Sequence, residues 1–146
     1  MYYFTPYGYL HGIFLIIIGI LAAPNMVVSR KPEAKEWIDK LVPFQGWLGV
    51  VSLVWGIIQI IRFLTKLQYF DDSVLVFLTW IVSAFCMIVI GILLGINVIK
   101  SFVSDEQAKE KMDQLVMKLA PKQGNFGLIS VIVGIWMIIQ LIFEIA

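Results

Sequence analysis

Four long apolar stretches, separated by shorter segments that carry most of the charged residues, dominate the hydrophobic pattern of the chain. The stretches cover residues 8–23, 46–63, 74–98 and 125–143. A helix needs about 20 mostly apolar residues to cross a bilayer, and each stretch is of roughly that length. The pattern predicts an all-α integral membrane protein with four transmembrane helices.

Two of the intervening polar segments, residues 32–42 and 105–119, also have apolar residues at helical spacing. The apolar positions are Ala34, Trp37, Ile38, Leu41 and Val42 in the first segment, and Ala108, Met112, Leu115, Val116 and Leu119 in the second. Both segments are too short and too charged to cross a bilayer. We expect each to form an amphipathic helix on the cytoplasmic membrane surface, the alternative being a docking helix for a soluble partner. Ser104, followed three residues later by Gln107, has the spacing of a capping box at the start of the second helix.

The order of span, amphipathic segment and span occurs twice, in residues 1–70 and 71–146. The offset between matching residues is 72 in the first spans, as from Gly19 to Gly91, and 78 in the second, as from Gly49 to Gly127. Each copy contains two spans, so both copies should have the same orientation. We expect a pseudo-twofold axis normal to the membrane to relate the two hairpins.

Small residues recur on one face of each predicted span, where they would let another helix backbone approach closely. The predicted helix-packing residues are Gly12, Gly19, Gly46, Gly49, Ser52, Gly56, Gly91, Gly95, Gly124, Gly127, Ser130 and Gly134. Spacing alone leaves open whether these faces meet inside one chain or between chains.

Composition strengthens the membrane assignment and gives the chain an orientation. The chain is 60% hydrophobic and 14% charged, with a mean hydropathy of +0.91, whereas soluble domains carry about 25% charged residues. Nine Lys and Arg residues lie in the two long loops, against Arg62 and Lys66 on the other side. The positive-inside rule therefore predicts cytoplasmic loops and both termini outside, in a bacterial cytoplasmic membrane. No Lys or Arg precedes the first span, so we expect it to be retained rather than cleaved as a signal peptide.

Few polar side chains lie inside the predicted spans, and these limit the chemistry. No acidic or basic residue lies deep in a span, which argues against a proton-coupled pump or an ion-coupled carrier. Gln59 and Gln140 are expected either to hydrogen-bond between helices or to line a narrow pore. His11 is expected to hydrogen-bond near the outer interface, the alternative being a haem or metal ligand completed by another subunit. Cys86 is the single cysteine, so neither a disulfide nor a cysteine metal site is expected.

Two further segments allow a bland interpretation and a functional one. Asp71 and Asp72 are predicted to cap the third span, the alternative being an external cation site. The aromatic start of the chain, with Tyr2, Tyr3 and Phe4, is predicted to anchor the outer interface, the alternative being an external ligand site.

No catalytic motif accompanies this architecture. The sequence contains no phosphate-binding glycine loop, no His-Glu-x-x-His and no paired carboxylates within the spans. We therefore expect a non-catalytic structural or assembly protein without a cofactor. Its expected partners are the lipid bilayer and either copies of itself or other membrane subunits, and nucleic acid is not expected. The alternatives are a small channel or facilitator for a neutral or small solute, and an accessory subunit that binds a lipid or cofactor shared with its partners.

Overall fold

The structure is a computed structural model that describes residues 5–65 and 74–143, and all regular secondary structure in these residues is helical. Three helical runs are long and apolar enough to cross a membrane: Ala34–Thr65, Val74–Ser101 and Glu106–Ile142. A fourth is obtained if the bent pair Gly8–Ala22 and Pro24–Arg30 forms one span. The prediction of a helical membrane protein is confirmed in this form. Asp71, Asp72 and the first aromatic residues of the chain lie outside the described residues.

The helices follow the predicted order along the chain. They are α1 (Thr5–Ala22), α2 (Pro24–Arg30), α3 (Ala34–Leu41), the 3-10 turn η2 (Val42–Phe44), α4 (Gln45–Thr65), α5 (Val74–Ser101), α6 (Glu106–Leu119), the 3-10 turn η4 (Ala120–Lys122) and α7 (Gln123–Ile142).

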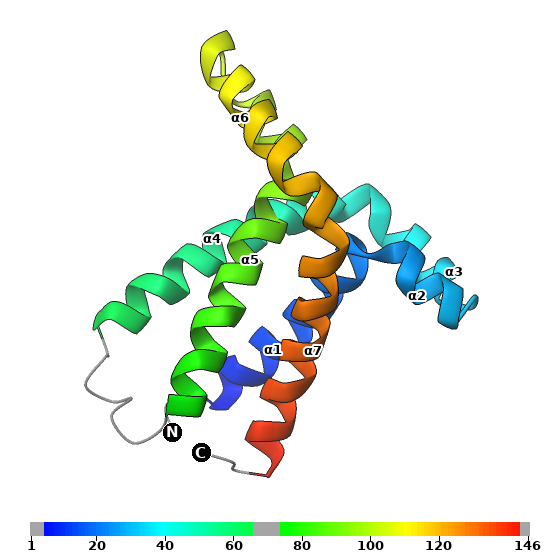
Figure 1. Cartoon of the computed structure of the whole chain (residues 1–146), viewed down its shortest axis with the longest axis vertical. Helices are drawn as coiled ribbons and strands as arrows, with labels where there is room; N and C mark the ends of the chain where they lie inside the picture. Colours follow the sequence, from blue (N-terminus) through cyan, green and yellow to red (C-terminus); the bar gives the residue numbers. More distant parts are fainter. Residues whose placement is uncertain (1–4, 66–73, 144–146) are drawn as a thin grey trace.

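Four long helices, α1, α4, α5 and α7, form the bundle (Figure 1). The most extensive contacts join α1 to α7 and α4 to α5, and both pairs are antiparallel. The short connection between the second and third spans predicts that α4 and α5 are antiparallel neighbours, and this is confirmed. Helix α5 also packs on α7 and α1, whereas α1 and α4 touch little. The close pairs thus join helices from different halves of the chain.

The centre of the bundle is an apolar core formed mainly by α1 and α5. Leu15 and Ile18 of α1 meet Met87 and Ile90 of α5, and all four side chains are fully buried. Met137 adds a contact from α7. Because lipid tails are as apolar as these residues, the core fixes shape by close packing rather than by ordinary hydrophobic burial.

A sharp bend separates α1 from α2. The axes of Gly8–Ala22 and Pro24–Arg30 differ by 91°, and Pro24, which lacks a backbone N–H, begins the new helix. The end of α1 leaves carbonyl groups without helical partners, and Gln123 Nε2 of α7 donates to the carbonyl oxygen of Ala22 at 3.1 Å. Helices α2 and α3 therefore turn to one side of the bundle (Figure 1).

Helix α5 continues without such a bend, and α6 projects beyond the bundle (Figure 1). With 28 residues α5 is about 42 Å long, which exceeds the roughly 30 Å thickness of a hydrocarbon core. Lys100, near its end, forms an ion pair with Asp113 of α6 at 2.6 Å. The end of α5 and α6 thus form a braced arm.

The start of α6 corrects the predicted capping box. Asp105, not Ser104, is the N-cap residue, and its carboxylate accepts a hydrogen bond from the backbone N–H of Gln107 at 3.0 Å. A carboxylate at this position satisfies a free N–H and also complements the positive end of the helix dipole.

Candidate functional site

Helices α1 and α7 approach each other backbone to backbone at two glycine contacts. A Cβ atom added to Gly127 would lie 2.7 Å from the carbonyl oxygen of Gly19. One added to Gly134 would lie 2.7 Å from the carbonyl oxygen of Gly12. Both distances are shorter than a real Cβ contact, so the pair can approach this closely only with glycine at these positions.

The same kind of contact joins α4 and α5. A Cβ atom on Gly91 would lie 2.6 Å from the backbone nitrogen of Leu53 and 2.8 Å from the carbonyl oxygen of Gly49. One on Gly95 would lie 2.9 Å from the backbone nitrogen of Val50, and one on Gly56 would meet the side chain of Ile88 at 2.9 Å. The small-residue faces therefore meet inside one chain, which answers the question that spacing left open.

Two buried serines add a hydrogen bond to each pair. Ser52 Oγ of α4 donates to the carbonyl oxygen of Met87 in α5 at 2.8 Å. Ser130 Oγ of α7 donates to the carbonyl oxygen of Leu15 in α1, also at 2.8 Å. Both serines are fully buried, so each hydroxyl is satisfied by the backbone of the facing helix.

The remaining predicted packing residues, Gly46 and Gly124, differ from each other. A Cβ atom on Gly46 would lie 2.7 Å from the Val98 side chain, whereas one on Gly124 would meet only the Met26 sulfur, at 3.9 Å. Gly124 therefore has room for a methyl group and provides a natural control.

We predict that Gly91→Ala and Gly127→Ala each lower the free energy of unfolding by about 1–3 kcal/mol, because the added methyl group would press against backbone atoms. Gly124→Ala should leave it unchanged within about 0.5 kcal/mol. Denaturant titration of the purified protein in mild detergent measures all three. Equal stability of Gly91→Ala and Gly124→Ala would contradict the close backbone contact.

His11 lies at the junction of three helices rather than at the surface, with only 1% of its area exposed. Its Nδ1 atom accepts a hydrogen bond from the indole N–H of Trp55 in α4 at 3.0 Å. Its Nε2 atom lies 3.0 Å from Ser83 Oγ in α5, and Ser83 itself donates to the carbonyl oxygen of Trp80 at 2.8 Å. Because the Ser83 proton is used in that bond, Nε2–H is the donor to Ser83 and His11 is the neutral tautomer.

This network occupies both ring nitrogens of His11. A metal or haem iron would need one of these lone pairs and would displace Trp55 or Ser83. The Trp80 ring, whose centroid is 5.1 Å from that of His11, covers the imidazole further. Within residues 5–65 and 74–143, no group of three or more His, Cys, Asp and Glu residues is placed to hold a metal ion. The arrangement fits the hydrogen-bonding interpretation of His11 better than the ligand interpretation.

The partners of His11 are the residues that sequence reasoning missed. Ser83 follows His11 by 72 residues, the offset that relates Gly19 to Gly91, so the two residues occupy matching positions in the two halves. Matching residues near a twofold axis face each other, and this signal could have identified Ser83. Trp55 has no comparable signal in the sequence.

Gln59 and Gln140 are both buried, with 5% of their area exposed. The Gln140 Nε2 atom has no hydrogen-bond partner, so it does not bond to Gln59. Gln59 lines a cleft of about 240 Å³ between α4 and α5, together with Arg62, Trp80 and Phe85. The two glutamines are thus in different surroundings. Cys86 is buried in the central core.

We predict that His11→Phe and Trp55→Phe each lower the free energy of unfolding by about 1–3 kcal/mol, because each leaves a buried polar partner unsatisfied. The double variant should lose less than the sum, by about 0.6–1.7 kcal/mol, as interhelical hydrogen bonds in membranes do. Trp47→Phe, at an exposed tryptophan, is the matched control and should be nearly neutral. Additive losses in the double variant would show that the two side chains do not interact.

Comparison with known proteins gives no relative: no family model, no curated protein and no solved structure matches this chain. Functional inference therefore depends on the geometry of the chain itself.

Proposed function

We propose that the protein is a non-catalytic structural and assembly component of the membrane, built from a helical unit used twice, whose projecting helix α6 docks a partner chain. The partner is a second copy or another membrane subunit. Two sets of observations support this: the matching contacts of the two halves, and the exposed surface of α6.

The doubled unit is supported by contacts that recur at the sequence offsets. Ser52 and Ser130 differ by 78 residues, and their acceptors Met87 and Leu15 differ by 72. Hydrogen bonds between matching residues are expected when a pseudo-twofold axis relates the halves, because each close pair then takes one helix from each half. Chance similarity of apolar segments would not reproduce the bonding partners.

The proposed topology has both termini outside and the two long loops in the cytoplasm of a bacterial cell. The contact between His11 and Ser83 fits α1 and α5 running in the same direction, as two copies of one orientation require. Lys35, Lys40, Lys109 and Lys111 all belong to the helices of the two long loops, where the positive-inside rule places cytoplasmic charge.

The observation that carries the assembly role is that α6 has no buried residue. Its apolar face includes Leu115, of which 42% is exposed, and Met112 and Val116, which are half-buried. An isolated helix of 14 residues is only marginally stable in water. Figure 1 shows α6 pointing away from the bundle, a direction suited to a partner beyond the membrane. A docked chain would cover the apolar face and stabilise the helix.

We predict that the protein purified from its native membranes in mild detergent has a mass above that of one chain. Leu115→Glu, which places a charge on the apolar face of α6, should release the partner and give the single-chain mass. Gln114→Glu adds the same charge on the polar side of the same helix and should leave the complex intact. Native mass spectrometry measures all three, and a single-chain mass for the unmodified protein would contradict the proposal.

A channel for a small neutral solute is the second candidate, and the unpartnered Gln140 amide favours it, because such a group can bind a passing polar molecule. The core layer of Leu15, Ile18, Ile90 and Leu94 is at most 5% exposed, which opposes a path through one chain. The path would then run between chains.

If the protein is a structural component, proteoliposomes containing it should pass glycerol and urea no faster than protein-free vesicles, as measured by stopped-flow light scattering. Flux that is abolished by Gln140→Leu, with the fold unchanged by circular dichroism, would favour the channel instead.

A further inference from the structure

The two close helix pairs differ at one end, although their glycine contacts match. In the α1–α7 pair, Gly8 packs against Leu141 so tightly that an added Cβ atom would lie 2.7 Å from the leucine side chain. The matching residues in the α5–α4 pair are Trp80, 72 residues after Gly8, and Phe63, 78 residues before Leu141. Two large rings therefore replace a glycine and a leucine, and α4 diverges from α5 toward Thr65 (Figure 1).

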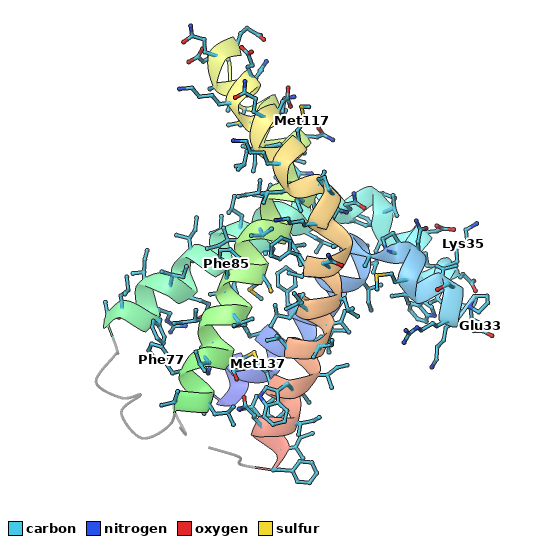
Figure 2. The ribbon with its side chains drawn as sticks, in the orientation of Figure 1. Glu33, Lys35, Phe77, Phe85, Met117 and Met137 are labelled. Atoms are coloured by element: carbon cyan, nitrogen blue, oxygen red, sulfur yellow. The ribbon has the colours of Figure 1, made fainter. Side chains whose placement is uncertain are left out.

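This divergence leaves the cleft of about 240 Å³. Its walls are apolar and come from both helices; they are formed by Ile60, Phe63 and Leu64 of α4 and by Trp80, Ile81, Ala84 and Phe85 of α5. Several of these residues are exposed on the outer face of the bundle, among them Phe85, which is labelled in Figure 2. Because α4 and α5 both belong to runs that are apolar enough to span a membrane, the cleft opens toward the bilayer.

Only two polar side chains line the cleft, and their order along α4 is informative. Gln59 is 95% buried, and Arg62 lies three residues, or about 4.5 Å, nearer the end of the helix. Moving outward from Ala84, the lining thus changes from apolar walls to an amide and then to a guanidinium group. A phospholipid has the same order of groups: acyl chain, ester carbonyl and phosphate.

We propose that this cleft binds one phospholipid of the leaflet at the α4 C-terminal end. One acyl chain lies between Ile81 and Phe85 of α5 and Ile60 and Leu64 of α4. The Gln59 amide donates to an ester carbonyl, and the Arg62 guanidinium contacts the phosphate, a pairing that its planar, charged donors favour. The volume is below the roughly 300–1,000 Å³ of sites for compact small molecules, which fits a single chain. The inference does not depend on the assembly role of α6.

The α1–α7 pair lacks such a site, because Leu141 fills the matching space and Gln140 stands where α4 has Arg62. The expected stoichiometry is therefore one lipid per chain.

The test uses the full-length protein in mild detergent, titrated with phosphatidylglycerol and followed by native mass spectrometry. We expect one retained lipid per chain at low lipid concentration. Ile81→Trp, which fills the cleft, should weaken retention at least tenfold. Leu78→Trp makes the same change at an exposed position outside the cleft on α5 and should leave retention unchanged.

The headgroup contact has its own comparison. Diacylglycerol with the same acyl chains lacks the phosphate and should bind the unmodified protein about tenfold more weakly than phosphatidylglycerol. Arg62→Gln should remove this difference, provided that circular dichroism shows the fold to be unchanged; if it unfolds, the comparison of the two lipids on the unmodified protein decides. Equal retention by Ile81→Trp and Leu78→Trp would overturn the site, and equal binding of the two lipids would overturn the phosphate contact.

Discussion

The close approach of helix backbones at glycine is the constraint on which the rest of this structure depends. In a bilayer, burial of apolar side chains gives little net driving force for helix association, because lipid offers the same environment. Association then depends on packing and on hydrogen bonds such as those of Ser52 and Ser130 to facing carbonyl groups. Both need short distances between helix axes, and Gly19 with Gly127, and Gly49 with Gly91, supply them.

The proposed twofold repeat gives one explanation for the pairing of helices and for its exceptions. A symmetric arrangement makes each close pair from one helix of each half, with matching residues such as His11 and Ser83 in contact. The exceptions come from single substitutions between the halves. Pro24 ends α1 where Ile96, at the matching position, lies inside a continuous α5, so one loop turns aside and the other projects. Trp80 stands in place of Gly8 and leaves a cleft where the other pair is closed.

The fold was largely predictable because each span carries its signal locally. The apolar stretches, the break at Pro24 and the short connection before α5 predict the helices and the antiparallel contact of α4 with α5. The pairing of α1 with α7 and the burial of His11 were not predicted, since they depend on which faces meet over more than 100 residues of sequence. Asp105 and Ser104 are one residue apart, and either could accept the capping bond; backbone geometry, not composition, decides between them. The cleft was missed because it arises from side-chain volume at two positions, Phe63 and Trp80.

The most direct test of the central claim is a disulfide cross-link between α4 and α5. A Cβ atom on Gly46 would lie 3.9 Å from the Cβ atom of Val98, within the roughly 3.5–4.5 Å that a disulfide requires. The variant Gly46→Cys with Val98→Cys, with Cys86→Ala to remove the native thiol, is oxidised and separated on a denaturing gel. The account predicts a bond within one chain and a band at the mass of one chain. A disulfide-linked dimer, or free thiols after oxidation, would contradict the pairing of these glycine faces inside a single chain.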